Sequence, residues 1–205
     1  MKLLSILIIL LIFPFNTHGE SIPGYNSKGH FHYQVNNSWV QISVSEISEY
    51  EETINVKDKY LTGFYLDSNK YGTWPYILIE FKKTRKQMTI KEISKIRDNL
   101  AGYNKTVNVN NDSVNKVLKE IGMGSPKVKL GSNVKLDVDS KILTISNIKV
   151  TAKPYDITVK TSYLFGCNGI LQVSYMSESS VYNNYVVEFD EFVNTIIFDK
   201  HYQYR

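Results

Sequence analysis

The sequence contains a single cysteine, Cys167, among its 205 residues. An intrachain disulfide is therefore excluded, and burial of apolar side chains must stabilise the fold. Proline is also scarce, with 5 residues, while hydrophobic residues make up 42% of the chain. This composition argues against extended disorder and predicts one folded domain with a substantial core.

The chain also lacks a strong excess of charge. Its formal net charge is +4, and no basic run is longer than residues 82–86. Nucleic-acid binding by counterion release usually requires a clustered stripe of lysine and arginine. We therefore expect no nucleic-acid partner and interpret residues 82–86 as a solvated turn at the end of a strand.

Recognisable catalytic motifs are missing as well. The segment 122–126 does not fit the Gly-x-Ser-x-Gly pattern of serine hydrolases, and there is no glycine-rich phosphate loop. Glu49, Glu51 and Glu52 crowd one predicted helix, and we expect Glu49 and Glu52 to form its solvated face. No acid/base pair of carboxylates is assigned from this pattern.

Histidine and cysteine give two weak candidates. His30 and His32 share one face of a predicted strand, with His201 as a conceivable third zinc ligand. Cys167 could act as a nucleophile with His201 as its base. A solvated strand face and an inert hairpin turn explain these residues without any site, and we favour that interpretation. We therefore predict no catalytic, cofactor-binding or metal-binding residue, and no cofactor.

The N-terminus has the pattern of a secretory signal peptide over residues 1–19. Lys2 precedes an apolar run from Leu3 to Phe13, and the small residues Thr17 and Gly19 precede an expected cut before Glu20. The apolar run is shorter than the roughly 20 residues that span a bilayer. A retained anchor is the alternative, and no later segment is apolar enough to form a membrane span.

Apolar periodicity predicts an α+β architecture. Residues 20–29 contain glycine and proline and are expected to form a flexible leader before a single globular domain over 30–205. Residues 31–35 and 39–44 alternate around a turn and are expected to pair as a hairpin. The predicted strands are 31–35, 39–44, 60–66, 75–81, 134–138, 142–150, 155–165 and 170–176.

Four amphipathic helices are predicted to pack on these strands, over 45–54, 88–100, 112–122 and 189–198. The pairs Ser43/Glu46 and Thr89/Glu92 match capping boxes at the first two helices. Because most strands follow one another through short turns, the sheet should be antiparallel, with 155–165 and 170–176 as neighbours. Residues 101–111 and 124–126 are expected to form a loop and a break.

Aromatic residues are abundant, at 13% of the chain. Trp39, Phe64, Trp74 and Tyr76 lie in or beside predicted strands, where aromatic side chains usually belong to the core. The alternative is an exposed aromatic groove for a peptide, glycan or lipid.

The order of elements resembles that of the PsbP-like family. The resemblance is carried by Phe31–Ser43 with its Trp39, by 60–64 and 74–79, and by the closing segment 189–198. It implies a central antiparallel β-sheet flanked by helices, an α/β/α sandwich, and an accessory, non-enzymatic role outside the cytoplasm. No functional residue of the family maps onto this chain.

These observations favour a non-enzymatic periplasmic or secreted protein that binds, or helps to assemble, another envelope or secreted protein. The composition, rich in asparagine, lysine, isoleucine and tyrosine and poor in alanine, suggests a bacterial source. One alternative is a small secreted hydrolase without a local motif. Another is a carrier with an apolar cavity between the sheet and the helices.

Overall fold

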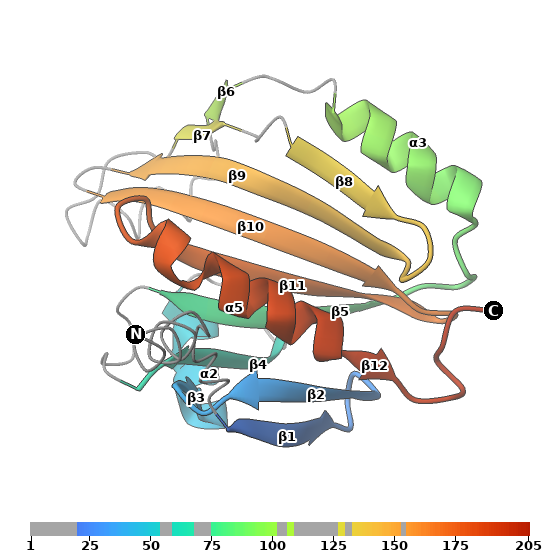
Figure 1. Ribbon diagram of the computed structural model, residues 1–205, viewed down its shortest axis with the longest axis horizontal. Helices are drawn as coiled ribbons and strands as arrows, with labels where there is room; N and C mark the ends of the chain where they lie inside the picture. The colour runs from blue at the N-terminus through green and yellow to red at the C-terminus, as the bar shows by residue number, and fades with distance from the viewer. Residues whose placement is uncertain are drawn as a thin grey trace, which may run out of the picture.

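The computed structural model describes residues 20–53, 59–67, 75–101, 106–108, 127–129, 133–152 and 155–205. Most of this part of the chain is strand (Figure 1). In chain order the elements are β1 (Ser21–Asn26), β2 (Phe31–Asn36), β3 (Trp39–Gln41), α2 (Val44–Thr53), β4 (Tyr60–Leu66), β5 (Tyr76–Lys83), α3 (Ile90–Ala101), β6 (Thr106–Asn108), β7 (Lys127–Lys129), β8 (Asn133–Asp137), β9 (Ile142–Ala152), β10 (Tyr155–Phe165), β11 (Gly169–Glu178), α5 (Tyr182–Thr195) and β12 (Ile197–Phe198).

The strands form two antiparallel sheets. A large sheet has the order β3-β4-β5-β11-β10-β9-β7-β6, with β8 also paired to β9, and a small sheet has the order β1-β2-β12. One apolar cluster joins the two sheets, because Phe31 and Tyr33 of β2 pack with Leu171 and Val173 of β11. Each of these four side chains is buried.

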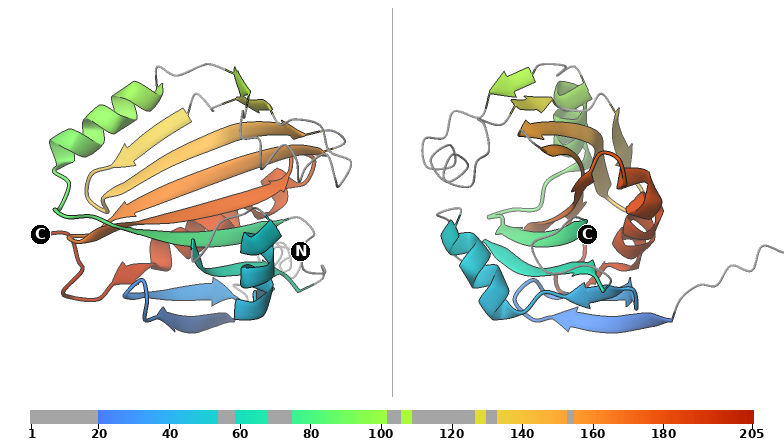
Figure 2. Two further views of the ribbon diagram at one scale, coloured as in Figure 1. Left: turned by 180° about the vertical axis from the view of Figure 1, so that it is seen from behind. Right: turned by 90° about the vertical axis from the view of Figure 1, so that its left-hand side faces the viewer.

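Helices lie on both faces of the large sheet, as the right-hand view of Figure 2 shows for α2 and α5. Helix α5 covers one face, where Phe189 and Phe192 are buried against β11 and β2. Ile47 of α2 and Ile93 of α3 are buried against the opposite face, on Leu78 and Leu143. The predicted α+β fold, an antiparallel sheet flanked by helices, is confirmed.

The hairpin of β10 and β11 agrees closely with the prediction. Its register pairs Leu164 with Leu171 across a turn at residues 166–168. Phe165, Leu171 and Val173 are buried, whereas Tyr163 is only half-buried. Tyr163 and Phe165 pack towards α3, while Leu171 and Val173 pack towards α5.

Both predicted capping boxes are present. The main-chain N–H of Ser43 donates to Glu46 Oε2 at 2.8 Å, and the N–H of Glu46 donates to Ser43 Oγ at 3.2 Å. Thr89 and Glu92 make the same reciprocal pair at 2.7 and 3.2 Å. These bonds satisfy donors at the first turn that the helix itself leaves unpaired, which fixes where α2 and α3 begin.

The flexible leader predicted for 20–29 is wrong, because strand β1 occupies most of it and pairs with β2 along its whole length. Gly24 lies directly over the ring of Tyr33, where an added Cβ would come within 2.2 Å of Tyr33 Cζ. Pro23 is tolerated because β1 is the edge strand of its sheet. The glycine and proline that indicated a loop therefore serve close packing on an edge strand.

The hairpin predicted from 31–35 and 39–44 is also wrong. Strand β2 pairs with β1 and β12, whereas β3 pairs with β4 in the other sheet. The chain crosses between the sheets at Asn37 and Ser38, and Ser38 O accepts the N–H of Asp67 at 2.8 Å. Alternation predicts which face a strand buries but not which strand lies beside it.

The last helix begins and ends earlier than the predicted 189–198. Helix α5 starts at Tyr182, whose side chain is buried on Tyr175, and Ile197–Phe198 form the short strand β12. Packing of Tyr182 thus overrides the turn-like sequence at Asn183 and Asn184.

Several predictions concern residues outside the described ranges: the signal peptide at 1–19, the helix at 112–122 and the position of Trp74. Strands β6 and β7 add a pairing that was not predicted, since 101–111 was expected to be a loop. Among the described residues, no helix is long and apolar enough to cross a membrane.

Candidate binding cleft

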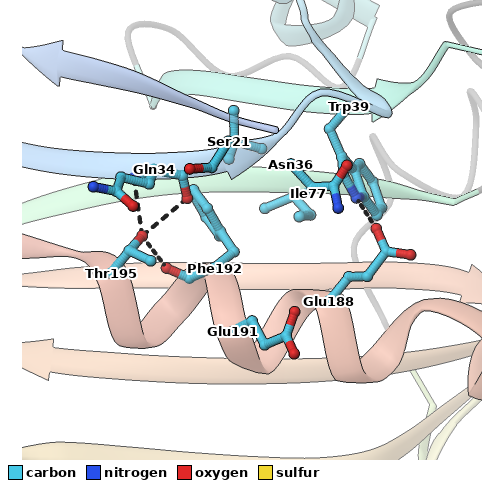
Figure 3. Close-up of a pocket in the computed structure, with 10 residues that line it drawn as sticks. Ser21, Gln34, Asn36, Trp39, Ile77, Glu188, Glu191, Phe192 and Thr195 are labelled. Carbon is cyan, nitrogen blue, oxygen red and sulfur yellow. Dashed lines mark hydrogen bonds between the residues drawn. The ribbon is translucent and has the colours of Figure 1, made fainter. Parts of the chain in front are cut away.

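A cleft of 360 Å³ lies between β2 and α5, on the α5 side of the large sheet (Figure 3). Strand β2 forms one wall, α5 forms the other, and β5 contributes Ile77. The residues that line it are Ser21, Gln34, Val35, Asn36, Trp39, Ile77, Glu188, Glu191, Phe192 and Thr195. The volume lies within the range of about 300–1,000 Å³ typical of ligand pockets.

Helix α5 presents one stripe of side chains to this cleft. Glu188, Glu191, Phe192 and Thr195 recur at the spacing i, i+3, i+4 and i+7, which places them on one side of a helix. Phe192 is buried between the helix and the sheets, whereas Glu191 is exposed. The stripe therefore combines an apolar base with a charged rim.

Trp39 holds the carboxylate of Glu188 in place. The indole Nε1–H donates to Glu188 Oε2 at 2.9 Å, and the hydroxyl of Ser38 donates to the same oxygen at 3.3 Å. Trp39 is itself 3% exposed and packs edge-on against Tyr175 and Tyr185. Both hydrogen bonds end on Oε2, which leaves Oε1 as the acceptor available to a ligand.

Thr195 closes one end of the cleft by binding the edge of β2. Its Oγ1 accepts the N–H of Gln34 at 2.9 Å and lies 2.9 Å from Gln34 O and 2.7 Å from Phe192 O. The Thr195 hydroxyl thus contacts both main-chain groups of Gln34, as the backbone of a neighbouring strand would do. Strand β12 pairs with β2 at the adjacent residues His32 and Phe31.

The base of the cleft is the apolar core itself. Val35, Ile77 and Trp39 are all buried there. Beneath them, burial raises the pKa of Tyr175 to about 12, and the charge of Glu188 contributes in the same direction. The cleft therefore has an apolar floor and a negatively charged rim.

Within the part of the chain that the structure describes, neither Glu188 nor Glu191 has an ion-pair partner. Asp190, between them in sequence, points to the other side of α5 and pairs with Lys160 at 2.6 Å. That side forms a second, more polar groove of 340 Å³ against β8, β9 and β10. Helix α5 thus separates a groove with a paired charge from a cleft with two unpaired carboxylates.

The predicted histidine candidates meet around Asp199. His32 Nε2 lies 3.1 Å and His30 Nδ1 3.8 Å from its carboxylate, and Tyr25 donates a hydrogen bond to it at 3.0 Å. His32 lies on the outer face of the small sheet with a 63% exposed side chain, and His30 stacks on Tyr202. Over the described ranges, no group of three or more His, Cys, Asp or Glu side chains could hold a metal ion.

Cys167 and His201 are also neighbours, but through the main chain. Cys167 Sγ donates to the carbonyl oxygen of His201 at 3.0 Å, and the Cys167 N–H donates to Tyr202 O at 2.9 Å. A carbonyl oxygen is not the base that thiol catalysis requires. The contact fastens the turn after β10 to the C-terminal segment.

The remaining candidates are placed as follows. Glu49 and Glu52 are exposed on α2 as predicted, while Glu51 is buried and accepts the N–H groups of Lys59 and Tyr60 at 2.7 and 2.6 Å. Phe64 belongs to the core, and Tyr76 is half-buried beside α2. The basic segment 82–86 is largely exposed at the end of β5, as expected.

Of the residues that line the cleft, Trp39 was a candidate from the sequence, whereas Glu188, Glu191 and Thr195 were not. The helix was expected to begin at Phe189 rather than at Tyr182, so Glu188 lay outside it. The common face of these residues was therefore not predicted. Spacing over the full helix would have placed the four cleft-facing residues on one stripe. Their pairing with Trp39 and Gln34 spans about 150 residues or more and has no local signal.

Comparisons with known proteins bear on the fold alone. No protein-family model matches the sequence, and no curated protein sequence is similar to it. The structure is similar to that of cyanobacterial PsbP (CyanoP) from Synechocystis sp. PCC 6803, with 8% identity, coverage of 91% of this chain and 96% of that one, and a TM-score of 0.57.

Two further structures align at lower scores. LpqN, involved in cell envelope biogenesis of Mycobacterium tuberculosis, shares 8% identity over 86% of this chain and 89% of its own, with a TM-score of 0.49. The Ran-binding protein Mog1p of Saccharomyces cerevisiae shares 10% sequence identity with this chain. The alignment covers 88% of this chain and 96% of Mog1p, with a TM-score of 0.43. On the alignment with CyanoP, the chain has a PsbP-like α+β fold.

Proposed function

We propose that this protein is an exported, non-enzymatic accessory protein that binds another periplasmic or secreted protein at the cleft between β2 and α5. The observation that carries the proposal is the fixed carboxylate of Glu188, held by Trp39 at the mouth of a preformed cleft. Polar groups held in place over an apolar floor are typical of recognition sites. The PsbP-like fold supports an accessory role by analogy only.

The chemistry of the cleft favours binding over catalysis. The described residues that line it include neither histidine, lysine nor cysteine, and the hydroxyl of Thr195 is occupied by main-chain groups. Glu188 and Glu191 are the groups that a hydrolase would have to use. The charged rim also makes the cleft a poor cavity for an apolar cargo.

Export is supported by the sequence of residues 1–19 and by the position of the expected cut. Glu20 O accepts the N–H of Asn37 at 3.0 Å, directly before β1. A cut before Glu20 would therefore keep every pair of β1 with β2. Sequencing the N-terminus of protein made with its native leader should give Glu20 as the first residue, whereas an intact Met1 would contradict export.

A position-specific crosslink tests the binding site. A benzophenone amino acid at Glu191 should crosslink, on illumination in the native envelope or culture fraction, to one protein that mass spectrometry identifies. The same group at Asp98, exposed on α3, serves as the matched control and should not crosslink to it. Equal crosslinking from both positions would contradict a partner site at the cleft.

An enzyme would behave differently in the same preparation. Ester, amide and glycoside substrates should not be turned over by the purified protein. Turnover that is lost in Glu188→Gln or Glu191→Gln would replace the accessory role with that of a carboxylate hydrolase.

A further inference from the structure

We infer that the cleft between β2 and α5 takes an arginine side chain from the partner, with its guanidinium on Glu188 and Glu191 and its stem on Phe192. This inference rests on the proposed function and names the chemistry of the partner.

Among the described residues, no cation pairs with the two carboxylates of the cleft, although the chain is basic overall. The protein carries 24 lysine and arginine residues against 20 acidic ones, so cations are available for pairing. Among the described residues, the cations that do form ion pairs form them away from the cleft, as Lys160 does with Asp190 and Lys82 with Glu80. Two carboxylates without a counter-ion at the rim of a cleft are complementary to a cationic ligand.

The geometry of the two carboxylates favours a forked cation. Residues three apart on a helix have Cβ atoms about 5–6 Å apart, so Glu188 and Glu191 approach a ligand from adjacent positions on one stripe. Glu188 Oε2 is occupied by Trp39 and Ser38, which orients Oε1 for an incoming donor. Arginine offers five N–H donors in a fixed plane and can bind both carboxylates at once, whereas lysine is a point charge.

The floor of the cleft suits the rest of an arginine side chain. Figure 3 shows the side chains of Phe192 and Ile77 between β2 and the α5 residue Glu191. A chain of three methylene groups gains free energy by lying on such a surface while its charged head stays at the rim. Asn36, on the β2 wall, supplies a further polar group beside the head.

The test uses the full protein and small probes of defined chemistry. The chain has only 2 tryptophans, so the indole N–H signal of Trp39 in a proton–nitrogen NMR spectrum is assigned by comparison with Trp74→Phe. Titration with N-acetyl-arginine amide should shift this signal in a saturable manner. N-acetyl-citrulline amide, a neutral analogue of the same shape, should not shift it at the same concentrations.

Variants locate the binding. Glu191→Gln should weaken binding of the arginine probe about tenfold or more while the Trp39–Glu188 hydrogen bond remains. Glu52→Gln, which changes an exposed carboxylate on α2 across the sheet, should bind as the parent does. The dispersion of the same spectra shows that both variants are folded.

The outcomes separate this inference from the function on which it rests. An absent shift, an equal shift with citrulline, or tighter binding of N-acetyl-lysine amide would overturn the arginine assignment. If the crosslink from position 191 still captured a partner, the accessory function would stand without it. An arginine shift without any crosslinked partner would instead support the cation site and overturn the protein-binding role.

Discussion

The indole Nε1–H of Trp39 donates a 2.9 Å hydrogen bond to Glu188 Oε2, and this bond joins the first strand of the large sheet to the last helix of the chain. Both groups are shielded from solvent, since Trp39 is buried and Glu188 is half-buried. The pair therefore contributes both to the position of α5 and to the shape of the cleft.

Removing the donor should destabilise the protein. Trp39→Phe keeps an aromatic ring but leaves the carboxylate of Glu188 with only the 3.3 Å bond from Ser38. A charged acceptor that loses a donor in a partly buried site costs about 1–3 kcal/mol, in addition to the volume lost from the core. Chemical denaturation measures the difference.

Glu188→Gln is the comparison for that variant, because its amide oxygen still accepts from the indole. We expect a smaller loss of stability than for Trp39→Phe. If the glutamine variant were the less stable of the two, the hydrogen bond would not be the stabilising feature.

Thr195 should protect the edge of β2 at Gln34. Thr195→Val keeps the shape of the side chain but removes the hydroxyl that contacts Gln34 N and O. Because these groups are exposed, water replaces the lost bonds in part, and we expect a cost of about 1 kcal/mol. The clearer signal is faster hydrogen exchange of the Gln34 amide, which Thr195→Ser should leave unchanged.

The local features of this fold follow from sequence, and the long-range ones do not. The capping boxes at Ser43 and Thr89 and the hairpin of β10 and β11 depend on residues within one turn of the chain, so spacing alone predicts them. The contact of Thr195 with Gln34 joins residues 161 apart, and nothing near either residue indicates it.

The failed predictions have the same physical origin. Gly24 indicates a loop by composition, yet it is required in β1 because the ring of Tyr33 occupies the space of a side chain. The alternation around Trp39 predicts a hairpin, but the indole pairs with a carboxylate of α5 and the strand joins the other sheet. In both places tertiary packing decides the structure.

The two faces of the large sheet should differ in their sensitivity to truncation. Leu171 is 0% exposed and packs in the cluster under α5, whereas Tyr163 is half-buried beneath α3. Leu171→Ala should cost about 3–5 kcal/mol, as for large-to-small changes at a fully packed site. Tyr163→Ala should cost less, because part of its ring is already in water. Denaturation curves that rank Tyr163→Ala above Leu171→Ala would contradict this assignment of faces.

The capping box of α3 should give the protein a measurable acid sensitivity. The main-chain N–H of Thr89, followed by Lys86 and the Thr89 hydroxyl, lowers the pKa of Glu92 from its ordinary value of 4.5 to about 2. Because the folded state lowers this pKa, the stabilisation is fully present above pH 4.5 and is lost as the pH falls through about 2. Glu92→Gln removes the charge on which this dependence relies.

The variant should therefore be less stable than the parent at neutral pH, and the difference should shrink as the pH falls from 4.5 towards 2. Thermal unfolding across that range measures it, with Glu52→Gln on α2 as the control that leaves this capping box intact. The carboxylate of Glu92 is close to solvent, so added salt should weaken the part of the effect that comes from Lys86 at 3.0 Å. Added salt should not change the part of the stabilisation that comes from the hydrogen bond of the Thr89 main-chain N–H. A difference between parent and variant that stayed constant with pH would show that Glu92 acts through shape alone and not through its charge.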